Sequence, residues 1–403
     1  MDSGIDTILA NTLDLLVVAI LVGVLARRLK LPYTVGLVVA GMGLAFFRVD
    51  THVALTHDII FDIILPPLLF EAALNIHWSE LRRDDAPILV LSIFGVAISA
   101  AVVCAGMALI LNWPLPAALV FGVLIAATDP VAVIAMFKDL GMGGRLRLLV
   151  ETESLFNDGV AAVFFGLALS WAQGHASGAG TALADLVRIS GGGIIVGAVV
   201  GGAALTIAGR TNDHLIETAL TCVAAYGAFL LAEHFHLSGV LATVAAGLLM
   251  GGVGVRGEGL HWGLSRQARA FALEFWEFLA FLANSMVFLL IGLAVGRIHF
   301  EDVGYVALGV AIVLVLLGRA ATVFPLSALF LRTHWRIPAP LQCVLWWGGL
   351  RGALALALSL SLPADLPMRD GVVIATFAVV AFSVVVQGLT MPTLLKFLGL
   401  RNA

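Results

Sequence analysis

Long apolar runs alternate with short charged connectors along almost all of the 403 residues. A helix that crosses a bilayer needs about 17 to 25 mostly apolar residues, and by that rule the chain holds thirteen segments, with twelve as the alternative. Charged residues make up only 12% of the chain, whereas soluble domains are about a quarter charged. The sequence therefore predicts a single all-α transmembrane domain over residues 1–403. Its expected spans are 7–26, 32–47, 58–76, 86–111, 115–137, 146–171, 183–208, 213–232, 237–253, 270–296, 303–331, 339–361 and 371–398.

The lysines and arginines of the connectors are distributed unevenly. One alternate set of connectors carries 16 of them and the other set carries four. Because cytoplasmic loops are enriched in basic residues, an odd number of spans places the N-terminus outside and the C-terminus in the cytoplasm, in the cell (inner) membrane. The longest connector, 254–270, is expected to lie at the membrane interface. The other two basic residues, Arg319 and Arg351, fall within apolar segments and need partners inside the protein.

Several classes of protein are disfavoured by the composition and by absent motifs. A net charge of −4 without a basic cluster excludes a nucleic-acid partner. The chain has no phosphate-binding loop, zinc-protease pair or serine-nucleophile motif, so neither an ATP-driven pump nor an intramembrane hydrolase is favoured. The first apolar run is followed by basic residues rather than a cleavage site, and we expect it to be retained. We therefore expect a non-enzymatic protein without a cofactor, surrounded by membrane lipid.

The fifth span carries a carboxylate immediately before a proline, within Ala-Thr-Asp-Pro-Val over 127–131. Pro130 has no backbone N–H, so the carbonyl of Ala126 loses its helical partner, and the proline ring disfavours helical dihedrals at Asp129. We expect the helix to break there. Irregular backbone at membrane depth is tolerated where it lines a cavity, and freed carbonyls beside a carboxylate are oxygen ligands for a small cation. A proline kink with purely structural hydrogen bonds is the alternative.

Four polar residues divide the sixth span into two faces, because residues four apart in a helix share a face. Ser154 and Asp158 form one face, on which a hydroxyl and a carboxylate could ligate a cation together. Glu153 and Asn157 form the neighbouring face. Ionisable side chains inside a membrane are costly and indicate function. We assign Asp158 to an ion site and Glu153 to a buried ion pair.

The partner of Glu153 is expected to be one of the two mid-membrane arginines. Removal of one member of a buried ion pair costs about 3 to 5 kcal/mol, so a buried arginine requires a carboxylate. Arg319 is the first candidate, but the residues alone do not choose between Arg319 and Arg351.

Three glycines surround Arg351 in the twelfth span, in Gly-Gly-Leu-Arg-Gly over 348–352. Glycine tolerates unwound backbone, so we expect a second helix break here, at which Arg351 would offset the negative carbonyl end of a broken helix. If 1–171 and 213–398 form two inverted repeats of six helices joined by a linking helix over 183–208, the fifth and twelfth spans are equivalent. Matching broken helices are the best sequence indication of a transporter's binding site.

The third span contains Glu71 shortly after Pro66 and Pro67, which are expected to kink the helix. Glu71 is expected either to line the cation route or to make a structural hydrogen bond to another helix. Among the other acidic residues, Asp62 is expected to be solvated or to cap a helix. Glu274 and Glu277 are expected to lie at the membrane interface. No role is assigned to Asp14 and Glu217.

Four stretches together resemble the NhaP-type sodium/proton antiporters, which are related to the animal sodium/hydrogen exchangers. They stand in the order of that family across nearly the whole chain: Leu-Pro-Pro-Leu-Leu-Phe-Glu (65–71), Ala-Thr-Asp-Pro-Val-Ala-Val (127–133), Glu-Ser-Leu-Phe-Asn-Asp-Gly (153–159) and Gly-Gly-Leu-Arg-Gly-Ala (348–353). The resemblance implies thirteen helices in inverted repeats, a homodimer, and broken helices five and twelve that cross at the ion site. Unlike the animal exchangers, the chain has almost no tail after its last span, which favours a prokaryotic origin.

The same resemblance implies a ligand set for a monovalent cation. The cation would be held by the side chains of Asp158, Asp129 and Ser154 and by the backbone of Thr128. Pro130 belongs to the same motif and would support the break that exposes these ligands.

Further roles also follow from the resemblance. It implies that Glu153 pairs with Arg319 and that Asn157 supports the site. Electrogenic relatives carry a second aspartate at the position of Asn157, so electroneutral exchange is implied here. We expect a secondary active antiporter that exchanges sodium or lithium for protons by alternating access, with potassium/proton antiport as the alternative because oxygen ligands alone do not fix the cation's size. A cation channel and a sodium-coupled carrier of organic anions are less favoured.

Overall fold

Helix fills the expected spans throughout the part of the chain that the structure describes. This computed structural model describes residues 13, 16–26, 28, 32–47, 56–139, 141–175, 178–257 and 263–400. Within these ranges the chain forms no strand, because a segment surrounded by lipid must satisfy its backbone hydrogen bonds internally. The prediction of an all-α fold is confirmed. Asp14 and the middle of the connector 254–270 lie outside the described residues.

Seven of the described helices are long and apolar enough to cross a bilayer, by length and composition. They are α5 (Asp85–Ile110), α8 (Arg145–Ala172), α9 (Ala179–Ala208), α10 (His214–His234), α12 (Arg266–Arg297), α13 (Tyr305–Ala328) and the continuous run of α16 (Arg369–Phe382), η4 (Ser383–Gln387) and α17 (Gly388–Phe397).

The other expected spans are occupied by shorter or interrupted helices, and two further short helices, α4 (Trp78–Arg83) and η3 (Phe300–Asp302), lie in connectors. The shorter and interrupted spans are Leu16–Ala26, α2 (Tyr33–Phe46), η1 (Ile59–Ile64) with α3 (Leu65–Asn75), α6 (Leu115–Leu124) with α7 (Val131–Asp139), α11 (Gly239–Leu249) with η2 (Met250–Val255), and α14 (Ala339–Trp347) with α15 (Ala353–Leu360).

The irregularity expected at Pro66 and Pro67 takes the form of a π-helical segment. Both prolines lie in the first turn of α3, and because they have no backbone N–H they cannot continue the hydrogen-bond pattern of the preceding turn. The π-helical η1 immediately precedes them. The third span therefore remains helical on both sides of the prolines, and α3 carries Glu71 into the interior.

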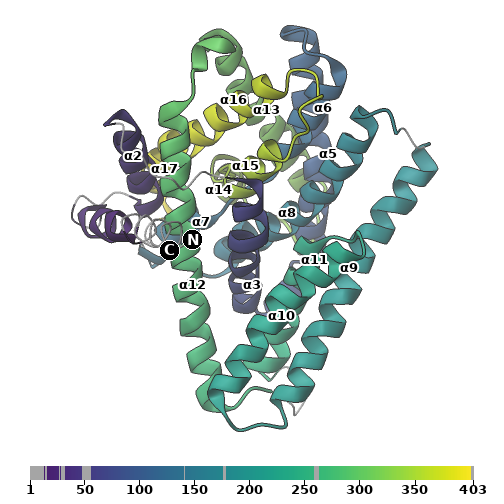
Figure 1. The fold of residues 1–403 in the computed structure, drawn as a ribbon, viewed down its shortest axis with the longest axis vertical. Helices are drawn as coiled ribbons and strands as arrows, with labels where there is room; N and C mark the ends of the chain where they lie inside the picture. The colour runs from purple at the N-terminus through teal and green to yellow at the C-terminus, as the bar shows by residue number, and fades with distance from the viewer. Residues whose placement is uncertain are drawn as a thin grey trace, which may run out of the picture.

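The helices pack around three apolar cores, and the first two of these define two groups of helices. One apolar core joins α5, α6, α7 and α8 with α13 to α17 and includes parts of α3 and α11, and another joins α3 with α9 to α12. In Figure 1 the first group occupies the upper part of the molecule, whereas α9, α10 and the lower part of α12 extend below it. Helix α2 packs against α12 in a third core that also includes parts of α15 and α16.

Glycines allow two of these helix pairs to approach at backbone distance. On α12, a Cβ on Gly292 would overlap the carbonyl of Val38 on α2. The glycine spacing in the seventh span serves the same purpose, since its members face the backbone of α11. Small residues permit such close helix contact in membranes. The glycines on α9 are Gly193, Gly197 and Gly201, opposite Ser238, Ala242 and Ala246.

Candidate ion-binding site at two crossing helix breaks

The two interrupted helices cross at their breaks. Helix α6 ends at Leu124 and α7 begins at Val131, while α14 ends at Trp347 and α15 begins at Ala353. Between them, the backbone N–H of Asp129 donates to the carbonyl of Leu350 at 2.8 Å, which gives one antiparallel bridge between the two extended stretches. Four half-helix ends therefore meet at one place in the interior.

The arginines neutralise the two carbonyl ends. The Arg351 guanidinium donates from Nη1 to the carbonyls of Ala126 and Ala127, at 2.6 and 2.9 Å, at the end of α6. Arg319 donates to the carbonyl of Leu345 near the end of α14, at 3.2 Å from Nε and 3.1 Å from Nη2. A cation at a helix C-terminus opposes the helix dipole. The sequence predicted that the Ala126 carbonyl, which Pro130 leaves without a helical partner, would be a cation ligand. In the structure this carbonyl instead accepts a hydrogen bond from Arg351.

Asp129 lies at the positive ends of the other two half-helices. Its Oδ1 accepts from the backbone N–H of Val131 at 2.9 Å, and its carboxylate also accepts from the backbone N–H of Ala353. These are the first residues of α7 and α15. A carboxylate at helix N-termini is favoured both by the free N–H groups and by the dipoles, so the crossing holds Asp129 in place through backbone groups.

A hydroxyl pair connects the first break to α8. The Ser154 hydroxyl donates to the carbonyl of Thr128 and accepts from the Thr128 hydroxyl at 3.1 Å. The next polar residue on that face of α8, Asp158, accepts from the backbone N–H of Thr128. Its Oδ1 is buried and has no hydrogen-bond partner among the described residues. The structure therefore brings Thr128, Ser154, Asp129 and Asp158 together, with one carboxylate oxygen left open.

The neighbouring face of α8 forms a buried ion pair. Arg319 donates from Nη1 and Nη2 to the two carboxylate oxygens of Glu153, both at 2.7 Å. The side chains are only 6% and 3% exposed, and Asn157 donates to Glu153 Oε1 at 3.4 Å. Two parallel charge-assisted hydrogen bonds fix both the distance and the orientation of the groups. This pair attaches α8 to α13 beside the candidate ion ligands.

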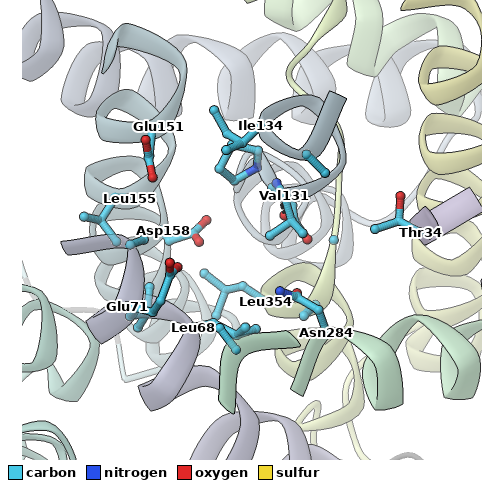
Figure 2. Close-up of a pocket in the computed structure, with 18 of the residues that line it drawn as sticks. Thr34, Leu68, Glu71, Val131, Ile134, Glu151, Leu155, Asp158, Asn284 and Leu354 are labelled. Atoms are coloured by element: carbon cyan, nitrogen blue, oxygen red, sulfur yellow. Dashed lines mark hydrogen bonds between the residues drawn. The ribbon is translucent and has the colours of Figure 1, made fainter. Parts of the chain in front are cut away.

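Glu71 lies on α3, on the same side of the view as Asp158 in Figure 2. Its Oε1 accepts from Asn75 Nδ2 at 2.7 Å, so the hydrogen bond runs to a residue of its own helix one turn away. Of the two roles expected from the sequence, a structural bond to another helix is thus absent among the described contacts. Glu71 instead lines a cavity that also reaches Asp129 and Asp158.

The cavity has a volume of about 260 Å³ and extends from the crossing to a charged mouth. Side-chain exposure falls along it, from 66% at Glu277 and 47% at Lys138 to 32% at Arg147 and 13% at Glu151. Figure 2 shows Glu151, Asp158 and Glu71 along one side of this cavity. Water can therefore reach the carboxylates from one end.

Some lining residues were missed or placed differently by the sequence. Glu277, which was expected at the interface, forms an ion pair with Lys138 at 3.0 Å and lines the mouth. Thr34 and Asn284 line the inner part of the cavity. Sequence reasoning missed both because neither side chain is charged. The only sequence sign of this wall is the polar pair Asn284 and Ser285 inside the apolar tenth span.

Glu217, which had no role from the sequence, is completely buried away from the cavity. Its Oε2 accepts from the backbone N–H of Ser265 at 2.6 Å, and the Ser265 hydroxyl in turn accepts from Ala268 at the start of α12. Glu217 therefore helps to hold the N-terminus of α12 against α10.

Residues 16–397 match the sequence profile of the transmembrane sodium/hydrogen exchanger family. The chain belongs to this family. Over 92% of its length the exchanger is 43% identical to the Na⁺/H⁺ antiporter ApNhaP of Aphanothece halophytica, of which it covers 70%. It is 33% identical to the Na⁺/H⁺ antiporter NhaH of Halobacillus aidingensis, over 98% of this chain and 99% of that protein.

The exchanger also shares its fold with a solved structure. The sodium proton antiporter MjNhaP1 from Methanocaldococcus jannaschii at pH 8 superimposes with a TM-score of 0.78 over 98% of this chain and 99% of that one. The two sequences are 21% identical, so this likeness concerns the fold. It agrees with the predicted multi-pass membrane architecture of interrupted and continuous helices.

Proposed function

We propose that this exchanger transports sodium ions in exchange for protons, and that Asp158 is the group that carries either one. The observation that supports this most directly is that Asp158, whose buried Oδ1 has no hydrogen-bond partner among the described residues, lines the same cavity as Asp129. A carboxylate that ligates a cation when ionised and holds a proton otherwise cannot carry both at once. Movement of the occupied site across the membrane then exchanges one for the other without a further energy source.

Charge balance at the crossing favours one cation per proton. The described crossing contains three carboxylates, of Glu153, Asp129 and Asp158, and two guanidinium groups, of Arg319 and Arg351. With all of them ionised, one negative charge is left over. A single monovalent cation or a single proton neutralises it, so both loaded forms carry the same net charge through a medium that penalises charge strongly. Exchange of one for the other is electroneutral.

The ligands of the cation are the open oxygen of Asp158, the carboxylate of Asp129, the Ser154 hydroxyl and the Thr128 carbonyl. Ser154 and Thr128 already bond each other, but a carbonyl and a hydroxyl oxygen each have two lone pairs. Hard oxygen ligands suit small metal cations. The supporting residues Glu153, Asn157 and Arg319 keep α8 fixed, and Arg351 with Pro130 keeps the break open.

In alternating access the site is open to one side of the membrane at a time. The cavity, which leads to the site from one end, fits this mechanism. Away from the mouth, α15 is buried along nearly its whole length, and His57 Nδ1 lies 3.0 Å from the carbonyl oxygen of Ala357. Lys138 and Arg147, at the mouth, belong to the connectors rich in basic residues, which face the cytoplasm. We infer from this bias that the cavity opens to the cytoplasm, and we propose the cell (inner) membrane with the N-terminus outside and the C-terminus in the cytoplasm.

Helix pairing supports two inverted repeats, 1–171 and 213–398, joined by the helix over 183–208. Helix α2 packs on α12, and α3 packs on α11. Helices α2 and α12 are the second and tenth spans, and α3 and α11 are the third and ninth. In an inverted repeat the second span is equivalent to the ninth and the third to the tenth, so the two pairs are equivalent to each other. Such swapped pairing is what a pseudo-two-fold axis in the membrane plane produces. From the same family resemblance we propose a homodimer.

Proteoliposomes under a set proton gradient test the function. Addition of sodium should release protons from liposomes that contain the parent protein, and Asp158→Asn should abolish the release. Asp370→Asn is the matched control, because Asp370 is 86% exposed and pairs only with Arg369 in the described contacts. Proton release by Asp158→Asn at the parent rate would contradict the assignment. Parallel additions of lithium and potassium decide between sodium/proton and potassium/proton exchange.

A further inference from the structure

The cavity has a second polar surface, opposite the carboxylates. It consists of Thr34 on α2 and Asn284 on α12, which we call the polar wall. In Figure 2 both lie on the right of the view, whereas Asp158, Glu71 and Glu151 lie on the left. Thr34 is only 2% exposed, and neither Thr34 Oγ1 nor Asn284 Oδ1 has a hydrogen-bond partner among the described residues. Buried polar atoms are nearly always paired, so two open oxygens on one cavity wall indicate a ligand.

The polar wall is held rigidly. The Tyr33 hydroxyl lies 2.7 Å from Ser285 Oγ, and the Tyr33 ring stacks on Phe281 with centroids 5.5 Å apart. Tyr33 and Ser285 are the chain neighbours of Thr34 and Asn284. Two turns along α2, the backbones of Gly41 and Gly292 are in close contact. The two open oxygens therefore occupy fixed positions on helices that contain neither break.

A cation held by the crossing would be covered by protein on one side only. Asp129 and Thr128 approach from the first break, and Asp158 and Ser154 from α8. The rest of the cation would face a cavity of about 260 Å³, which is large enough for several water molecules. Water bound to a cation directs its oxygen inward and its hydrogens outward. It therefore needs hydrogen-bond acceptors around it, and a hydroxyl and an amide oxygen are acceptors.

We infer that the polar wall binds the water shell of a partly hydrated monovalent cation while Asp158 and Asp129 ligate the cation itself. This inference rests on the proposed function. Thr34 and Asn284 are then positioning residues that act through water, and they set the affinity for the cation without touching the exchanging carboxylate. Because the polar wall is uncharged, it changes the affinity for the cation without changing the charge balance of the crossing.

Sodium-driven proton release from proteoliposomes tests the inference through the KM for sodium. Thr34→Val and Asn284→Leu remove the acceptors with little change of shape. Each should raise the KM about three- to tenfold, the range expected for one water-mediated hydrogen bond, while the maximal rate stays near that of the parent. Asn284→Asp adds a negative charge to the wall and should lower the KM at alkaline pH. Misfolding cannot explain a KM that rises in Asn284→Leu and falls in Asn284→Asp.

The matched control is Thr376→Val on α16, which removes a buried hydroxyl that bonds Val372 within its own helix outside the cavity lining. Its KM should stay within about twofold of the parent. Parent-like KM values for both wall variants, or a raised KM for Asn284→Asp, would overturn the inference. If the parent protein fails to exchange sodium for protons, the proposed function fails instead. Calorimetric titration of the purified variants with NaCl then still measures whether the wall contributes to sodium binding.

Discussion

The carboxylate of Asp129 lies directly against Gly352, so close that a Cβ at position 352 would overlap Oδ2 and Cγ. Gly352 is the residue before α15, and Asp129 is the residue before Pro130 and α7. This contact lies where the two breaks cross. It places the carboxylate at two helix N-termini, which no larger residue at 352 would permit.

Gly352→Ala should therefore abolish exchange while the helices around the crossing still form. The added methyl group must displace Asp129, and a misplacement of about 1 Å in a site can cost about 100-fold in rate. Gly95→Ala on α5 is the control, since a Cβ there meets no atom within 4 Å. We would measure sodium-driven proton flux and thermal unfolding for both variants. Parent-like flux for Gly352→Ala would show that the crossing can relax around the methyl group.

Loss of either member of the Glu153–Arg319 pair should destabilise the protein strongly. A buried charge left without its partner costs about 3 to 5 kcal/mol, so Arg319→Met and Glu153→Leu should each lower the unfolding temperature in detergent. The double variant Glu153→Leu/Arg319→Met leaves no orphan charge and should recover much of the loss. Additive losses in the double variant would mean that the two residues do not interact as the 2.7 Å contacts indicate.

Apparent sodium affinity should weaken as the pH falls. Protonation of Asp158 removes the negative charge that binds the cation, so proton and sodium compete for the site. For simple competition the KM for sodium rises by up to about tenfold for each pH unit below the titration of the site, while the maximal rate at saturating sodium is retained. Sodium KM values at a series of pH values test this relation, and a KM independent of pH would exclude simple competition.

The ion pair at the cavity mouth should affect entry of the cation more than stability. Lys138 and Glu277 are both substantially exposed, and an exposed pair contributes about 0 to 1 kcal/mol. Their charges nevertheless act on the approaching cation, so Lys138→Met should lower the sodium KM and Glu277→Gln should raise it. Because surface charges are screened by salt, both effects should shrink at high ionic strength. Equal effects at low and high ionic strength would argue for a local structural change instead.

The charge count at the crossing predicts that exchange is insensitive to membrane potential. A potential imposed with potassium and an ionophore should leave the initial rate of sodium/proton exchange unchanged, because one charge moves in each direction. Asn157→Asp adds a further carboxylate beside Glu153 and should make the rate respond to the potential. A voltage-dependent rate in the parent protein would require a different stoichiometry.

Charged residues in apolar runs made the central features of the site predictable. Asp129 before Pro130, and Arg351 among glycines, indicate helix breaks because the local backbone chemistry alone disfavours continuous helix there. The four-residue spacing on α8 likewise separates Ser154 and Asp158 from Glu153. These inferences depend on residues close together in the chain, where helix geometry fixes the distances.

Other features depended on how distant helices pack. The choice between Arg319 and Arg351 as the partner of Glu153 could not be made from local sequence, because the paired residues are 166 positions apart. The carbonyl of Ala126 was expected to face a cation but accepts from Arg351, which no pattern within the fifth span could indicate. Thr34 and Asn284 are uncharged, so the absence of hydrogen-bond partners for their side-chain oxygens among the described residues is visible only once the helices are assembled.

The bond between Arg351 and Ala126 joins residues 225 positions apart, which has a consequence for biosynthesis. When the ribosome has made the first half of the chain, Asp129, Asp158 and the open carbonyl end of α6 are already in the membrane, but the arginines that balance them do not yet exist. The unfinished protein must keep these groups near water or near other polar groups until residue 351 is inserted. The transport site is therefore among the last parts of the molecule to assemble, and quality control that recognises exposed intramembrane charge would act on chains that stop before it.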